Sequence, residues 1–172
     1  MSRIAGSSTE VAIRDFRRRF VPLIATLIAA SLSGLLPIVA TVPLVPDIGF
    51  MVLIAWRLLR PELWSAQVAL GLGLLNDLLS GHPLGQSMAL WTLTFLAFEF
   101  VDARIGFRDY WLDWLFAAAA IIFYTFGGWY VARLMGSATP FTVMVPQILL
   151  SILTFPVVAR LVLALDRWRL AR

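Results

Sequence analysis

The sequence predicts an all-α integral membrane protein, a bundle of six transmembrane helices with short loops and both termini in the cytoplasm. The chain is 60% hydrophobic with a mean hydropathy of +0.87, and six apolar segments use up almost all of its 172 residues. Charged residues make up 14% of the chain, against about a quarter in a typical soluble domain. We therefore expect one transmembrane domain over 1–172, with a cytoplasmic arm over 1–20, a six-helix bundle over 21–165 and a basic cytoplasmic tail over 166–172.

The composition excludes several classes of function. Cysteine is absent, which excludes disulfides, thiolate metal sites and cysteine catalysis. The net charge of +4 is spread along the expected membrane edges, so anionic lipid headgroups, and not nucleic acid, are the expected charged partner. No phosphate loop, zinc-ligand spacing or Ser/His/Asp arrangement is present, and the single histidine, His82, is expected to be a turn residue. The sequence therefore predicts no catalytic residue, metal or cofactor.

The N-terminal arm ends in a basic amphipathic stretch. Ser7 and Glu10 have the spacing of a capping box, which marks the start of a helix. Ile13, Phe16 and Phe20 share one helical face, with the arginines largely off it. Two interpretations stay open: a short helix that lies on an anionic leaflet, or a positive flank that only orients the first span. The arginines of this arm are the expected membrane-surface residues: Arg14, Arg17, Arg18 and Arg19.

The first two spans differ in regularity. Span one, over 21–37, has small residues every four positions at Ala25, Ala29 and Ser33, which suits close contact with a neighbouring or partner helix. The stretch with three prolines that follows cannot form a regular helix. It is expected to lie against the protein at membrane depth. Span two, over 48–59, is roughly 18 Å long against a hydrocarbon core of about 30 Å, so whether it crosses fully stays open.

The remaining spans are separated by turns and charged residues. Spans three and four are expected over 62–80 and 84–101, and spans five and six over 110–135 and 141–165. The charged residues around the loop between spans four and five predict a solvated ionic cluster, made of Glu99, Asp102, Arg104 and Arg108.

Arginine, which supplies all 14 basic residues, sets the expected orientation. With the N-terminus in the cytoplasm, every arginine except Arg133 falls on the cytoplasmic side. The positive-inside rule requires far less asymmetry than this. If span two did not cross the membrane, the later loops would invert and the bias would be lost.

The most distinctive motif joins spans three and four. It reads Gly-Leu-Gly-Leu-Leu-Asn-Asp-Leu-Leu-Ser-Gly-His-Pro-Leu-Gly and runs from a glycine-rich helix into a tight turn. Ala69, Gly73 and Asp77 share one helical face, so Ala69 is a candidate helix-packing or partner contact, and Gly81 and Gly85 shape the turn. A carboxylate at a membrane boundary is costly unless it is hydrated, paired or hydrogen-bonded. Asp77 is therefore expected to accept hydrogen bonds from backbone N–H groups in the turn or at the start of span four.

This motif resembles the MreD family of bacterial rod shape-determining membrane proteins. The family pattern is a glycine-rich helix, an aspartate, two apolar residues, a small residue with glycine, and Leu-Gly after a short gap. A Pro-Asp pair before a short span also resembles the family. The matching positions are Pro46, Asp47, Gly73, Asp77, Gly81 and Gly85.

The resemblance implies a non-enzymatic scaffold in the bacterial cytoplasmic (inner) membrane, with a fold similar to the substrate-binding subunit of energy-coupling-factor transporters. It implies MreC as the main partner. It also implies a complex with RodA, a class B penicillin-binding transpeptidase and MreB that supports lateral peptidoglycan synthesis and cell shape.

Architecture does not decide function, so two alternatives stay open. The first is a vitamin-binding membrane subunit of an energy-coupling-factor transporter. Such a subunit needs a pocket lined by polar and aromatic side chains, and the outer half of this chain offers few: Asn76, Asp77, Gln86, Trp129, Tyr130 and Arg133. The second is a cation held between Asp47 and Asp77.

Overall fold

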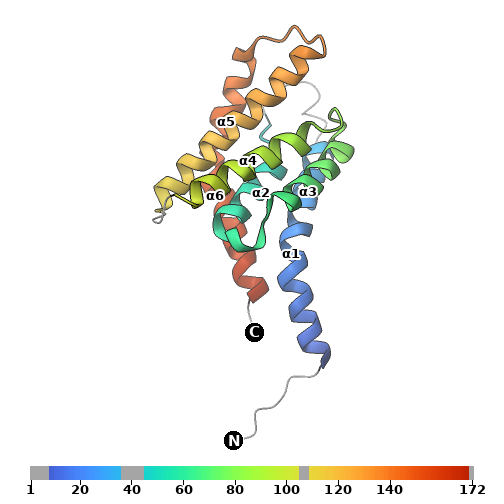
Figure 1. Ribbon diagram of the computed structural model, residues 1–172, viewed down its shortest axis with the longest axis vertical. Helices are drawn as coiled ribbons and strands as arrows, with labels where there is room; N and C mark the ends of the chain where they lie inside the picture. The colour runs from blue at the N-terminus through green and yellow to red at the C-terminus, as the bar shows by residue number, and fades with distance from the viewer. Residues whose placement is uncertain (1–7, 36–44, 105–108, 171–172) are drawn as a thin grey trace, which may run out of the picture.

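The computed structural model describes residues 8–35, 45–104 and 109–170, and this part of the protein is helical with no β-strand (Figure 1). The elements are α1 (Ser8–Leu35), α2 (Ile48–Leu59), η2 (Pro61–Leu63), α3 (Ala66–Ser80), α4 (Gln86–Asp102), α5 (Tyr110–Leu134), η3 (Phe141–Met144) and α6 (Val145–Leu170).

Helices α2 and α5 coincide with the expected spans almost to the residue. Asp47 caps α2, because its carboxylate accepts a hydrogen bond from the backbone N–H of Phe50 at 2.9 Å. Helix α3 begins later than expected, at Ala66, because residues Pro61–Leu63 form the short helix η2 instead. Proline supplies the first residue of that turn and cannot donate a backbone hydrogen bond.

Two helices are longer than the sequence analysis expected. Helix α1 joins the arm and span one in one helix that contains Pro22. Helix α6 continues past residue 165 to Leu170, so the expected tail is mostly helical. Asp166 and Arg169 lie on one helical face and bond to each other, which favours continuation of the helix. The expected N-cap Ser7 and the prolines within 37–44 lie outside the described residues.

The exterior of this protein differs from that of a soluble domain, although the core is apolar in both. Large apolar side chains are exposed along the helices, including Ile28, Leu78 and Leu153. Soluble monomers rarely expose apolar patches of this extent. The buried polar side chains among the described residues are Thr26, Arg57, Asn76, Asp77, Ser87, Thr94, Ser151, Asp166 and Arg169. An apolar exterior, with the polar side chains of the interior bonded to one another or to the backbone, suits a lipid solvent.

Two helical segments of the described part are long and apolar enough to cross a bilayer, Tyr110–Leu134 and Phe141–Leu170. Helices α2 and α3 are apolar but have only 12 and 15 residues. Their lengths of roughly 18 and 22 Å fall short of a hydrocarbon core of about 30 Å. Their ends are therefore expected to meet neighbouring protein groups inside the membrane region.

Helices α3 and α4 are the most extensively packed pair in the described part. A Cβ atom on Gly73 would lie 2.6 Å from the Cα atom of Met88, so glycine is needed for this approach. Each helix also supplies an acid to the start of the other. Asp77 of α3 accepts from the first backbone N–H groups of α4, and Glu99 of α4 accepts from the N–H of Ala66 at 3.2 Å. The free N–H groups at both helix starts thereby find acceptors.

Helix α2 connects two polar ends of the bundle. It is capped at its start by Asp47, which contacts Tyr124 of α5. This region and the α3–α4 turn together are called the turn end. Helix α2 ends next to Arg60, which contacts the last turns of α6, and we call this region the arginine end. The start of α1 and the end of α6 lie toward the same side of the molecule (Figure 1).

Candidate functional site

Asp77 organises the turn end. Its carboxylate accepts backbone hydrogen bonds from Gly85 at 2.9 Å, Ser87 at 2.8 Å and Met88 at 3.4 Å, and the residue is 1% exposed. These donors are the free N–H groups at the start of α4, where the helix dipole is positive. The negative charge of Asp77 is therefore stabilised by a helix end and not by a basic side chain.

The glycines of the motif make this contact possible. Gly81 ends α3 with φ at 68°, and Gly85 precedes α4 with φ at 95°, a left-handed conformation that other residues adopt at a cost. Gly73 brings the backbones of α3 and α4 together one turn before Asp77. The local sequence thus positions the carboxylate against the start of α4.

A chain of hydrogen bonds links Asp77 to Asp47. Ser87 binds Asp77 through its backbone, and its hydroxyl accepts a bond from the side-chain amide of Asn76 at 3.0 Å. The same hydroxyl lies 3.5 Å from the hydroxyl of Tyr124, which donates to Asp47 at 2.7 Å. The start of α2, the start of α4 and the middle of α5 are therefore held by one polar network.

A cavity of about 490 Å³ adjoins this network. The start of α2, the α3–α4 turn, α5 and residues 137–151 all contribute to its walls. Its polar and aromatic lining includes Asp47, Gln86, Tyr124, Trp129 and Gln147. Of the outer residues singled out from the sequence, Gln86 and Trp129 thus line the cavity. Asn76 and Asp77 are buried in the adjoining network, and Tyr130 and Arg133 are exposed outside the lining.

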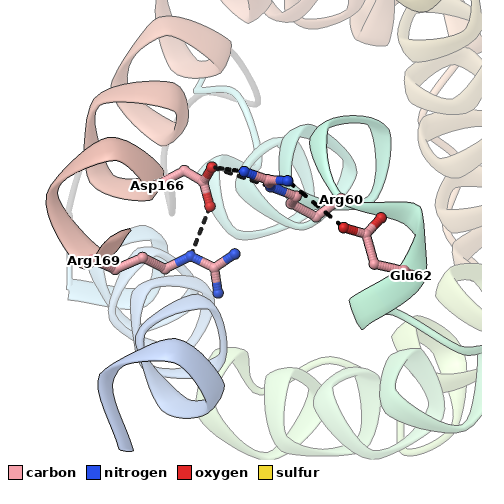
Figure 2. A network of polar contacts seen from close by, with 4 residues as sticks. All are labelled: Arg60, Glu62, Asp166 and Arg169. Atoms are coloured by element: carbon pink, nitrogen blue, oxygen red, sulfur yellow. Dashed lines mark hydrogen bonds and ion pairs between the residues drawn. The ribbon is translucent and has the colours of Figure 1, made fainter. Parts of the chain in front are cut away.

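The arginine end uses ion pairs. Arg57, which is 2% exposed, pairs with Asp102 at 2.8 Å. Figure 2 shows Asp166 between two arginines, with Arg60 at 2.9 Å and Arg169 at 2.7 Å. Helices α2, α4 and α6 are held together at this end by guanidinium–carboxylate contacts.

The acidic partners of Arg60 stabilise the charged form of its guanidinium group. A hydrogen bond and the charge of Asp166 raise the pKa of the Arg60 guanidinium above its already high ordinary value. Glu62 lies 3.7 Å away and adds a weaker, exposed contact. Arg169 also lies with its guanidinium carbon 5.2 Å from the ring centroid of Trp56, a cation–π distance.

The ionic cluster expected around Glu99 differs from the one observed. Asp102 pairs with Arg57 of α2, and Glu99 accepts from the backbone of α3. Arg104 instead stacks over Phe100 at 4.2 Å. Arg108 lies outside the described residues. The partners of Asp102 and Glu99 depend on how the helices pack. The spacing of charges along one loop does not predict that packing.

The small-residue positions lie mainly inside the bundle. Ala29 and Ala69 are buried and Ala25 is half-buried. The side chains of Ser33 and of the four arm arginines lie outside the described part, although their backbone belongs to α1. Pro46 is half-buried and lines the cavity next to Asp47. Neither Ala29 nor Ala69 is therefore available to a partner in this structure.

Sequence reasoning missed three central residues, Ser87, Tyr124 and Asp166. Ser87 follows two residues after Gly85, in the first turn of a helix, where a hydroxyl commonly bonds to neighbouring polar groups. Tyr124 carries a hydroxyl in the apolar interior of span five, next to that of Thr125, and in lipid such a hydroxyl calls for a partner. Asp166 was assigned to the tail because Arg167 and Arg169 surround it.

These features define a helical membrane protein with a polar interior network and no metal cluster in the described residues. A family model described as rod shape-determining protein MreD matches residues 14–166 of the 172-residue chain. The chain belongs to the MreD family, a family of bacterial membrane proteins with a role in rod shape determination. No curated protein and no solved structure matches the chain.

Proposed function

We propose that this protein is a non-enzymatic, multi-pass scaffold of the bacterial cytoplasmic membrane that binds MreC. RodA, a class B penicillin-binding transpeptidase and MreB are the further members proposed for the complex, which supports lateral peptidoglycan synthesis. The family match over residues 14–166 carries this proposal. The apolar exterior supports it, because apolar helix faces are the surface that the described part offers to partner segments in a membrane.

The proposed topology has six spans, both termini in the cytoplasm and a fold similar to the substrate-binding subunit of energy-coupling-factor transporters. The arginine end, with Arg57, Arg60 and Arg169, then faces the cytoplasm. The turn end, near which Arg133 lies against Trp129, faces outside. The arm arginines of α1 are proposed to contact anionic lipid.

The proposed contact for MreC is the exposed face of α3. Gly71 is exposed, and a Cβ atom added there would meet nothing within 4 Å, so packing inside this chain does not require glycine. A glycine inside a helix costs about 1 kcal/mol relative to alanine. Gln67 is exposed one turn earlier on the same face. A small residue with a nearby amide is the combination that lets a second membrane helix approach closely and form a hydrogen bond.

Copurification in mild detergent tests the scaffold and its contact face. Gly71→Leu is expected to lower the recovery of MreC by about tenfold, the loss that corresponds to roughly 1.4 kcal/mol. Ala119→Leu is the matched control, because Ala119 is an exposed small residue on α5. Equal recovery with both variants would place MreC on another face, and absence of MreC from the unaltered protein would contradict the scaffold.

The cavity at the turn end favours the transporter alternative as a second candidate. It provides a polar and aromatic site of about 490 Å³, within the range of small-ligand pockets. Under that alternative, an energy-coupling ATPase module and a bound vitamin copurify with the protein. Recovery of that module without MreC would replace the scaffold proposal.

A further inference from the structure

The cavity at the turn end has an unusual charge. Among the described residues that line it, Asp47 is the one acid and none is an arginine. The partners of Asp47 are neutral, since one carboxylate oxygen accepts from the N–H of Phe50 and the other from the hydroxyl of Tyr124. Among the described residues no basic side chain forms an ion pair with it. The carboxylate can accept further bonds, because an ionised carboxylate offers about four acceptor positions.

The walls add groups that suit a cation. Phe50 and Tyr124 stack at 4.2 Å between centroids, and Trp129 also lines the cavity. Aromatic faces attract cations, and Trp129 already has the exposed Arg133 at 5.9 Å from its ring. The Nδ1 atom of His82, another lining residue, is buried without a hydrogen-bond partner. An unsatisfied buried polar atom of this kind calls for a ligand or solvent partner.

The size of the cavity suits an organic ligand. Its volume of about 490 Å³ is many times the roughly 30 Å³ that one water molecule occupies in the liquid. The negative charge and the absence of a lining arginine disfavour anions. The combination of a carboxylate, aromatic rings and neutral amides therefore selects for a donor-bearing cation with an apolar body.

We propose that this cavity binds the cationic group of an amine, which Asp47 neutralises and which Phe50, Tyr124 and Trp129 surround. The amine belongs either to a small molecule or to a basic side chain of a partner protein. Because Tyr124 and Ser87 connect Asp47 to Asp77, occupation of the cavity stiffens the contact between the starts of α2 and α4. The inference does not depend on which protein partner the scaffold holds.

Thermal unfolding of the full chain in detergent tests the site with a defined probe. Phenethylammonium is expected to raise the Tm by about 5 °C at about 100-fold excess over its Kd, and the neutral phenethyl alcohol to leave it unchanged. Asp47→Asn is expected to abolish the shift, because asparagine keeps the cap of α2 and removes the charge. Glu62→Gln, which removes a charge at the arginine end, is expected to retain the shift.

A second variant separates binding from folding. Ala132→Phe fills the cavity without altering Asp47 and is expected to lose the shift in a protein that stays monodisperse. Equal stabilisation of the unaltered protein and Asp47→Asn, or equal shifts with the amine and the alcohol, would overturn the proposal. Absence of any shift with the unaltered protein would overturn it as well.

Native mass spectrometry and copurification distinguish the two sources of the amine. A small basic molecule that is bound to the unaltered protein and lost from Asp47→Asn supports a free ligand. A protein that copurifies and is lost from the same variant supports a basic side chain of a partner. A variant that retains both the small molecule and the copurifying protein would contradict the proposal.

Discussion

The two ends of α2 both depend on buried or half-buried carboxylates, but different groups stabilise the charge. At the arginine end, Asp102 and Asp166 pair with guanidinium groups at 2.8 and 2.9 Å. At the turn end, Asp47 and Asp77 accept bonds from backbone N–H groups and from the Tyr124 hydroxyl. Helix starts stabilise a negative charge without neutralising it. The comparison shows that the arginine end is internally compensated, whereas the turn end keeps net negative charge beside a cavity.

The two cavities of the described part differ in their charge in the same way. The described lining of the turn-end cavity includes one acid, two amides and several hydroxyls beside its apolar side chains. A second cavity of about 370 Å³ lies between α2, α5 and α6 toward the arginine end, and its lining is largely apolar. Its charged residues, Asp113 and Arg160, have opposite signs. Of these two cavities in the described part, the one at the turn end therefore lies beside uncompensated charge.

The largest effect is expected at the arginine end. Asp166→Ala removes a carboxylate that pairs with Arg169, which is 4% exposed, and should cost about 3–5 kcal/mol of unfolding free energy. The double variant Asp166→Ala with Arg169→Met should recover much of the loss, because the buried positive charge that Asp166 balanced is removed as well. Unfolding in detergent measures both, and a double variant no more stable than the single one would contradict the ion-pair account.

A somewhat smaller effect is expected for Asp77→Ala, about 3 kcal/mol, because it leaves buried N–H groups at the start of α4 without an acceptor. Asp77→Asn should lose less, since the amide oxygen still accepts. No side-chain substitution elsewhere can compensate here, because the donors belong to the backbone. Thermal unfolding of the two variants, together with rescue of rod shape in cells, checks this. A fully stable but inactive Asp77→Ala protein would assign Asp77 to binding instead of capping.

The smallest of these effects is expected for Gly73→Ala, about 1–3 kcal/mol, because the added Cβ atom meets the backbone of Met88 at 2.6 Å. Gly71→Ala in the same helix is the control. It should be neutral or stabilising, because space is open at that position and alanine favours helix. If both variants lose equal stability, close packing of α3 on α4 does not explain the glycine.

Local sequence was sufficient to predict the elements whose boundaries carry strong local signals. Helix α2 starts after the Pro46-Asp47 pair and ends before Pro61, so a cap and a proline fix both ends. The turn after Asp77 could be predicted because Gly81 and Gly85 lie on either side of Pro83, two residues away from it. Asp77 makes backbone contacts of the kind that this spacing led us to expect.

The remaining site depends on packing between distant segments. Arg57 meets Asp102 across 45 positions of sequence, and Tyr124 meets Asp47 across 77. One sequence contains no signal for such pairs, because they depend on how the helices cross. The expected end of α6 was wrong for a related reason. Asp166 belongs to a charged segment in the sequence, and its partner Arg60 lies 106 positions away.

The central claim is that the arginine end faces the cytoplasm and the turn end faces outside. The chain has no cysteine, so single-cysteine variants give an unambiguous label. Leu84 and Ser137 report the turn end, and Glu62 reports the arginine end. In intact cells, a membrane-impermeant maleimide is expected to label Leu84→Cys and Ser137→Cys but to label Glu62→Cys only after the membrane is opened. Labelling of Glu62→Cys in intact cells, with protection of Leu84→Cys, would contradict the account.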